Sequence, residues 1–206
     1  MVERYAREEM TKQWTQYARY AAWLEVEKAA VKAWNKLGLI PDADCEKIIK
    51  NATFSVERIE EIEAVTKHDL IAFNTSVSES LGEESRWFHY GMTSSDAVDT
   101  GVALQMRDSL KIIIEDVKML MESIKKRAIE HKMTLMVGRS HGIHGEPVTF
   151  GLTLAVWYDE VARHLLNLEQ TMEVIAIQKT ALDGMKNDLR ELLEMTENAT
   201  RKYTSI

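Results

Sequence analysis

The sequence predicts an all-α protein, because residues that interrupt helices are scarce and clustered. Its 206 residues include 2 prolines and 9 glycines, whereas average usage would give roughly 10 and 14. Residues 1–37, 102–137 and 152–183 contain neither type. Strands average about 5–6 residues, so segments this long without a turn residue are expected to be helical. A β-sandwich, a Rossmann domain and a P-loop enzyme are excluded, and the glycine motifs of the last two are absent from the sequence.

The first half of the chain is expected to form a small N-terminal helical domain, residues 1–100. A long helix runs from about Glu8 to Lys36, and Gly38 and Pro41 follow it in the order typical of a helix C-terminus. Shorter helices are expected at about 42–51, 55–64 and 67–81. The segment 82–91 is expected to be a turn or a short helical piece.

The second half, residues 101–206, is expected to form long helices of an oligomeric helical bundle. Apolar residues in two stretches repeat every 3.5 residues on average, which is typical of helices packed side by side. The first seam consists of Leu110, Ile114, Val117, Met121, Ile124 and Ala128, and the second of Val161, Leu165, Leu168, Met172 and Ile175. After a skip at Lys179 the pattern resumes, and we expect a further buried helical stripe of Leu182, Met185, Leu189 and Leu192. Helices of roughly 35–50 residues exceed about 50 Å, so we expect their seams to be buried against other subunits.

Charge and cysteine content narrow the function classes. A net charge of −7 argues against broad nucleic-acid binding. The single cysteine, Cys45, cannot form an internal disulfide, which favours a reducing compartment. No apolar run approaches 18 residues, and the N-terminus lacks the apolar core of a signal peptide. We therefore expect a cytoplasmic protein with no membrane or nucleic-acid partner.

Five of the eleven glycines and prolines lie in one segment, residues 138–151, which is expected to be a loop joining two long helices. It carries His141 and His144, and functional residues concentrate on loops that a rigid scaffold holds. The alternative interpretation is a glycine-rich connection with solvent-exposed histidines. A metal site is less favoured, because no cysteine or third histidine lies at ligand spacing.

A second candidate segment, residues 91–99, places hydroxyl groups directly before a long helix. Thr93, Ser94 and Ser95 precede Asp96, which is typical of helix capping. Hydroxyls and free backbone N–H groups at a helix N-terminus also suit an anion. The segment therefore indicates capping and a candidate site for a carboxylate or phosphate.

The third candidate is a histidine between a cation and a carboxylate, at residues 66–69. Lys67 and Asp69 flank His68 at the start of an expected helix, and such neighbours can shift a pKa or orient a tautomer. A lone histidine in a helical pattern is more often a packed or surface residue.

Taken together, four segments resemble the adenylosuccinate lyase family of the aspartase/fumarase superfamily. They are RY at 4–5, TKHD at 66–69, GEESRWFHYGMTSSDAVDT at 82–100 and GRSHGIHGEPVTFG at 138–151. The resemblance covers roughly residues 1–175 and leaves residues 176–206 unmatched. It implies a mostly helical homotetramer that releases fumarate from adenylosuccinate to give AMP, and from the succinylocarboxamide ribotide of purine biosynthesis. No cofactor and no metal are implied.

The resemblance also implies roles for particular residues. His141 would be the general acid that protonates the leaving nitrogen, with His68 as a second catalytic histidine. The residues expected to bind the substrate are Arg4, Tyr5, Lys67, His68, Asp69, Thr93 and Ser94. Of these, Thr93 and Ser94 would hold a carboxylate of the succinyl arm, where preorganised donors stabilise developing charge.

One family feature is missing from the sequence. The family's catalytic base is a serine in a segment like S-S-x-M-P-x-K-x-N, which does not occur in these 206 residues. Since a family member needs roughly twice this length, we expect the chain to correspond to an N-terminal portion with little or no activity alone. The alternative is a non-catalytic helical oligomerisation or interaction protein derived from the same scaffold.

Overall fold

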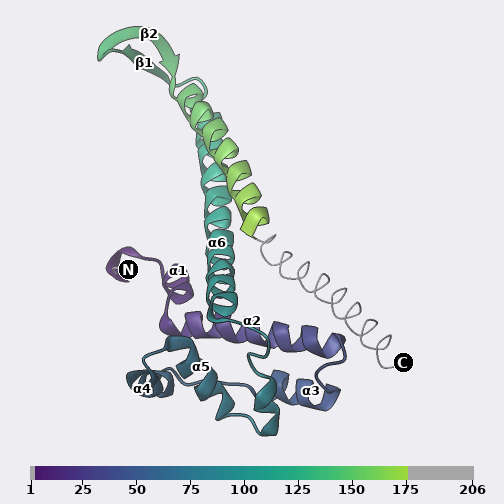
Figure 1. Ribbon diagram of the computed structural model, residues 1–206. Coiled ribbons are helices and arrows are strands. Elements are labelled where there is room, and N and C mark those ends of the chain that lie inside the picture. Colours follow the sequence, from purple (N-terminus) through teal and green to yellow (C-terminus); the bar gives the residue numbers. More distant parts are fainter. Residues whose placement is uncertain (1–2, 176–206) are drawn as a thin grey trace. The chain divides into compact units, whose positions relative to one another are not determined.

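The computed structural model describes residues 3–175 (Figure 1). This part of the chain divides into two units, one extending to Met106 and one formed by Arg107–Val174. Helices make up most of both, as predicted for the fold class. None of the helices in the described part is long and apolar enough to cross a membrane.

The elements follow one another along the chain with short connections. In order they are η1 Glu3–Tyr5, α1 Glu8–Gln13, α2 Gln16–Lys36, α3 Asp42–Asn51, α4 Val56–Thr66, α5 Asp69–Ser78, η2 Glu83–Trp87, α6 Ser94–Glu130, β1 Leu135–Ser140 and β2 Ile143–Thr149. Residues 150–175 form a further helix.

The long helix expected from Glu8 to Lys36 is interrupted near its start. Trp14 ends α1, and the Thr15 side chain accepts a hydrogen bond of 3.1 Å from the N–H of Ala18 to cap α2. A threonine that caps the next helix is a local alternative to continuing the first one. The expectation of a single helix is therefore wrong by one break.

The first unit is built around α2, with α3, α4 and α5 packed below it in the view of Figure 1. Its core contains an aromatic cluster in which Tyr20 and Trp23 of α2 contact Phe73 of α5, with ring centroids 5.9 and 5.5 Å apart. These three side chains are almost fully buried. Burying an aromatic side chain removes a large apolar area from water, so this cluster anchors the helices to one another.

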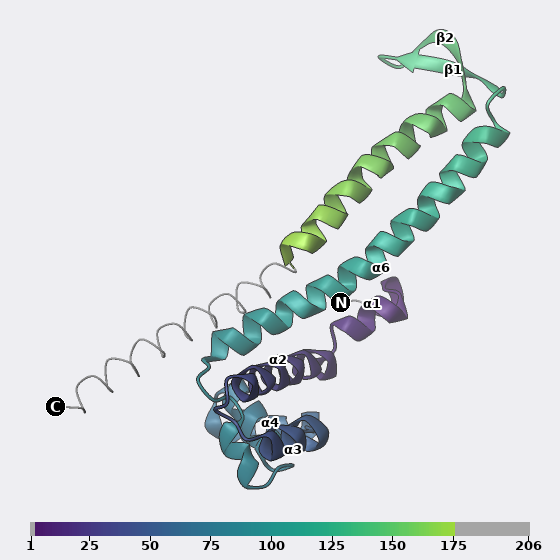
Figure 2. The ribbon, with the colours of Figure 1, turned by 90° about the vertical axis from the view of Figure 1, so that its right-hand side faces the viewer.

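The second unit contains two antiparallel helical segments, the C-terminal part of α6 and the helix of residues 150–174, which lie side by side (Figures 1 and 2). The predicted seam positions are the inward ones: Leu110 and Ile114 are buried, and Val117, Met121, Ile124 and Ala128 are half-buried. The seam residues from Val161 to Ile175 are also half-buried. The 3.5-residue repeat therefore identified the less exposed face of both segments, and burial of this face against other subunits stays a prediction. The stripe from Leu182 to Leu192 and the skip at Lys179 lie outside the described residues.

The segment expected to be a loop between the long helices is a β-hairpin. β1 and β2 pair antiparallel, with Leu135 opposite Thr149 and Ser140 opposite Ile143. The register shifts between Val137 and Arg139, where a Cβ on Gly138 would approach the Glu146 carbonyl oxygen to 2.5 Å. Gly138 therefore permits the close approach at an irregularity in the ladder. The helical class holds, but the loop prediction for residues 138–151 is wrong.

Candidate functional site

The start of α6 is capped by a carboxylate. The Asp96 Oδ2 atom accepts a hydrogen bond of 2.7 Å from the N–H of Thr93, and the N–H of Asp96 donates to the Thr93 carbonyl at 3.1 Å. This is the return half of a capping box. In the part of the chain that the structure describes, no hydrogen bond uses the hydroxyls of Thr93 and Ser94. They are available to an anion, although the Asp96 carboxylate lies in the same turn.

His68 caps α5 through its ring. Its Nδ1 atom accepts a hydrogen bond of 3.4 Å from the N–H of Ile71, so the neutral ring carries its proton on Nε2. The Asp69 Oδ1 atom lies 3.6 Å from the same Nδ1 but accepts a shorter bond, 2.7 Å, from the N–H of Leu70. Because an accepting Nδ1 cannot also donate, the cap is the dominant interaction in this geometry. The backbone N–H of Ile71, and not the side chain of Lys67 or Asp69, thus orients the tautomer, and Nε2–H is left as a donor.

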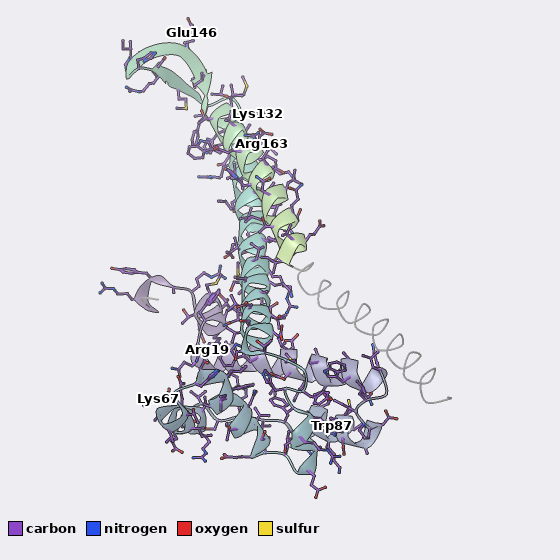
Figure 3. All side chains as sticks on the ribbon, in the orientation of Figure 1. Arg19, Lys67, Trp87, Lys132, Glu146 and Arg163 are labelled. Carbon is purple, nitrogen blue, oxygen red and sulfur yellow. The ribbon has the colours of Figure 1, made fainter. Side chains whose placement is uncertain are left out.

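Lys67 is the residue between the end of α4 and His68, the N-cap of α5. It adopts a left-handed conformation, φ 54°, as the C-cap of α4, and its side chain is exposed (Figure 3). This backbone conformation costs lysine more free energy than it would cost glycine, which is the usual residue at such a C-cap. Lys67, His68 and Asp69 are therefore neighbours at a junction of two helices.

The N-terminal pair forms a separate small group. The Arg4 guanidinium lies 4.7 Å from the centre of the Tyr5 ring, and Tyr5 is 78% exposed. Among the described residues, no hydrogen bond or ion pair joins this pair to residues 67–69 or to Thr93 and Ser94. Membership of one shared pocket stays a prediction.

His141 lies in the second unit, at the tip of the hairpin. His141 and Gly142 form a two-residue turn with φ values of 54° and 76°, which matches a type I′ turn. The exposed His141 side chain thus lies at the tip of the hairpin, and His144 pairs with Arg139 farther along it. Figure 3 shows Glu146 projecting from the same hairpin. No group of three potential metal ligands occurs within residues 3–175.

Sequence reasoning missed one residue, His89, which follows η2. Its ring Nδ1 atom lies 2.6 Å from Oε1 of Glu27, a residue with no solvent exposure, and this hydrogen bond raises the pKa of His89 above its usual value. Burial opposes the rise, and the charge of Asp96 adds to it. Glu27 gave the available signal, since it falls on the apolar stripe of Tyr20, Trp23 and Val31 in α2.

A left-handed backbone conformation recurs in three of these segments. The non-glycine residues with positive φ in the described part are Lys67, His89 and His141. Each lies within one of the four segments that resemble the lyase family. Such conformations cost about 1–3 kcal/mol, and they cluster at functional sites.

Comparison with known proteins places the chain. The profile of a family described as lyase matches residues 3–189. The chain belongs to this lyase family. The match extends past residue 175, where the resemblance was expected to end. It includes part of the segment that was expected to be unmatched.

Two curated relatives of this lyase-family chain carry the same description. The chain is 59% identical over 200 residues to adenylosuccinate lyase of Helicobacter pylori (strain ATCC 700392 / 26695), covering 97% of this chain and 45% of that protein. It is 48% identical over 179 residues to adenylosuccinate lyase of Bacillus subtilis (strain 168), covering 87% and 42%. The chain spans less than half the length of these relatives.

The lyase fold is also found among solved structures. Fumarate lyase from Mesorhizobium sp. BNC1 superposes with a TM-score of 0.74 at 28% identity, covering 80% of this chain and 40% of that one. The 3-carboxy-cis,cis-muconate lactonizing enzyme from Pseudomonas putida gives a TM-score of 0.70 at 27% identity, covering 81% and 40%.

Proposed function

We propose that this chain forms the N-terminal part of an adenylosuccinate lyase, which releases fumarate from adenylosuccinate to give AMP and acts likewise on the succinylocarboxamide ribotide of purine biosynthesis. The observation that carries the proposal is the 59% identity to the H. pylori protein over 97% of the chain. The hydroxyls at the start of α6 support it, because a succinyl carboxylate needs such donors.

The proposed roles follow from the chemistry of elimination. A proton leaves the carbon next to a carboxylate, and a second proton must reach the departing nitrogen. His141 is the proposed general acid, since its exposed imidazole can donate a ring proton and one placed proton donor contributes about 10²–10⁴-fold. Thr93 and Ser94 would bind the carboxylate whose charge grows in the transition state.

The remaining candidates are proposed to hold the nucleotide. Lys67 supplies an exposed cation, and His68 supplies an Nε2–H donor whose direction the α5 cap fixes. Asp69 follows in the same turn. Arg4 and Tyr5 would stack on or pair with the nucleotide from the N-terminal segment, as the family pattern implies. No cofactor enters this scheme.

Ligand binding tests the proposal without requiring turnover. Differential scanning fluorimetry of the 206-residue protein with AMP or adenylosuccinate is expected to show a rise in melting temperature. His141→Ala and Arg4→Ala should each reduce that rise, whereas His164→Ala, a change on the exposed side of the 150–175 helix, should leave it intact. No rise in the unsubstituted protein would count against a nucleotide site.

The catalytic activity of the chain is tested separately from its ligand binding. Because the serine segment of the family is absent from these 206 residues, we expect the chain alone to release fumarate far more slowly than a whole family member. Ultraviolet detection of fumarate from adenylosuccinate measures this. Release at a rate typical of the family would refute the expectation.

A second candidate function is a non-catalytic helical assembly protein, and one observation supports the assembly that it shares with the lyase proposal. The second unit exposes large apolar side chains on its helices, among them Ile113, Leu120, Leu152, Val156, Trp157 and Leu166. Apolar residues exposed at this density on long helices are typical of interfaces between subunits. We propose that the chain forms a homo-oligomer, a tetramer by family pattern, in the cytoplasm. Light scattering with and without adenylosuccinate separates assembly from ligand binding.

A further inference from the structure

Glu27 is a carboxylate in the middle of α2 with no solvent exposure. Burying a charged group without partners costs several kcal/mol, because water no longer solvates it. Tyr20, Trp23 and Val31 are buried on the same helix, so an apolar residue would suit this position by packing alone. The partner of Glu27 therefore indicates what the carboxylate does.

Both carboxylate oxygens of Glu27 form hydrogen bonds with His89. Oε2 accepts a hydrogen bond of 3.1 Å from the backbone N–H of His89, and Oε1 lies 2.6 Å from the ring Nδ1 of the same residue. Glu27 thus holds His89 by its main chain and its side chain together. The His89 backbone is left-handed, with φ 61°, a conformation that histidine adopts at a cost. The two hydrogen bonds offset that cost.

The ring of His89 has a second nitrogen that Glu27 leaves available. The side chain is 23% exposed, and no hydrogen bond to Nε2 occurs within the described residues. The hydrogen bond with Glu27 of α2 and the charges of Glu27 and of Asp96 of α6 all raise the pKa of His89. The ring is therefore a cation of fixed orientation over a wider pH range than a free histidine.

A second contact with α2 holds the same turn. The Trp34 indole N–H donates to the Tyr90 carbonyl at 2.9 Å, and a Cβ on Gly91 would come within 3.0 Å of the Trp34 ring. Glu27 and Trp34 are seven residues apart, so they lie on one face of α2. One helix face thus fixes residues 89–91.

The fixed turn leads directly to the proposed anion-binding hydroxyls. Met92 and Thr93 separate Gly91 from the first residue of α6, Ser94. With so few residues between them, the position of Thr93 depends on the conformation at His89. A misplacement of about 1 Å at a reacting group can cost about 100-fold in rate.

We propose that Glu27 is a positioning residue, which grips the main chain and ring of His89 and through them sets the turn that presents Thr93 and Ser94 to the substrate. The presentation of substrate rests on the proposed function, whereas the grip on the turn does not. If the pair of Glu27 and His89 were purely structural, it would hold α2 to the turn equally well without the charge of Glu27. The experiment therefore compares the protein with and without that charge.

The test compares Glu27→Gln with Asp44→Asn in the full 206-residue protein. The glutamine side chain keeps the shape and can still accept the backbone hydrogen bond, but it carries no charge. Asp44 of α3 is the matched control, because its carboxylate accepts a hydrogen bond of 2.9 Å from the Trp87 indole next to the same turn without contacting His89. NMR would measure the ring pKa of His89 and the amide exchange of residues 89–94.

We expect Glu27→Gln to return the pKa of His89 toward its ordinary value and to speed exchange at residues 89–94 by about tenfold or more. Asp44→Asn should leave both unchanged. Exchange and ring pKa identical to those of the unsubstituted protein would overturn the proposal. If Glu27→Gln does not fold, the unsubstituted protein decides: raising the pH through the pKa of His89 should speed exchange at 89–94 relative to α4, and a constant ratio would overturn the proposal.

Adenylosuccinate binding supplies the readout for the substrate site, because its succinyl carboxylate is the group that Thr93 and Ser94 would hold. Calorimetry should show an affinity about tenfold or more weaker for Glu27→Gln and an unchanged affinity for Asp44→Asn. Equal affinities for Glu27→Gln and the unsubstituted protein would overturn the positioning role. If the unsubstituted protein binds no adenylosuccinate, the proposed function fails, and the exchange and ring measurements still decide whether Glu27 sets the turn.

Discussion

Gly101 of α6 lies directly against Trp23 of α2, and a Cβ placed on Gly101 would come within 2.6 Å of the Trp23 Cδ1 atom. Trp23 is 1% exposed and also packs edge-on against Tyr20 and Phe73, so its indole cannot move aside freely. A glycine inside a helix lowers the stability of the helix by about 1 kcal/mol relative to alanine. The close approach of the two helices at this point explains why the position is glycine.

Gly101→Ala should therefore destabilise the protein although alanine is the better helix former. Overpacking a core costs about 1–3 kcal/mol, which outweighs the gain in helix propensity. Urea unfolding followed by circular dichroism measures the difference. Val102→Ala, at the neighbouring and 38% exposed position, is the control and should change stability by less than about 0.5 kcal/mol. A more stable Gly101→Ala protein would contradict the packing described for α2 and α6.

A second glycine, Gly151, lies at a close backbone contact within the second unit. A Cβ there would meet the Ala128 carbonyl oxygen and would lie 2.6 Å from the Lys132 Cα atom, both of which are backbone. Backbone atoms at a helix end cannot yield as a flexible side chain can. The Gly151 N–H also donates to the His131 carbonyl at 2.9 Å, so this is the point where the returning helix is tied to the end of α6.

We expect Gly151→Ala to loosen this junction by about 1–3 kcal/mol. Hydrogen exchange of the Phe150 and Gly151 amides, which bond to the carbonyls of Thr134 and His131, would speed up. Gly145→Ala is the matched control, because its Cβ would meet its nearest neighbour, the Gly138 carbonyl oxygen, at an ordinary 3.6 Å. Equal exchange in both variants would show that the junction tolerates the extra methyl group.

The sequence was sufficient to predict the helices but not the hairpin, and this difference has a physical reason. Long segments without glycine or proline, and apolar residues every 3.5 positions, determine α6 and its seam. The hairpin lacks the alternating apolar pattern that predicts strands, because most residues of β1 and β2 are exposed on both faces. Pro147 within β2 and the register shift at Gly138 conceal it further.

The candidate site shows a similar limit. Motifs located Lys67, Thr93 and His141, since each lies in a segment of unusual composition. The contact of Glu27 with His89 joins residues 62 positions apart in the chain, and no local pattern specifies such a pairing. A glutamate on an apolar helix stripe is the sign that a distant partner must exist.

The pKa of His89 predicts how stability depends on pH. A histidine whose pKa is raised on folding contributes stability that is fully present below the unfolded value, about 6.5, and is lost as the pH rises through the folded value. The hydrogen bond with Glu27 is the main cause, and the charge of Asp96 acts in the same direction. Stability should therefore fall as the pH increases above about 6.5.

The variant that isolates this effect is His89→Asn, since asparagine tolerates a left-handed backbone and does not titrate. Urea unfolding between about pH 5.5 and pH 8.5 should give a steeper decline for the unsubstituted protein than for His89→Asn. The other five histidines are common to both proteins and cancel in the difference. Parallel curves would show that His89 binds its proton equally in the folded and unfolded states.

The hairpin tip offers a substitution that separates folding from the proposed chemistry. His141 occupies the first position of a type I′ turn with φ 54°, where Asn followed by Gly is preferred, and Gly142 already supplies the second position. His141→Asn should relieve backbone strain and leave stability unchanged or raise it by up to about 1 kcal/mol. The same change removes the imidazole, the proposed proton donor. We expect the urea midpoint to hold or rise while the adenylosuccinate-dependent rise in melting temperature shrinks, as it should for His141→Ala. If the midpoint falls instead, the histidine ring supports the hairpin, and its left-handed conformation does not mark a site where stability is given up for function.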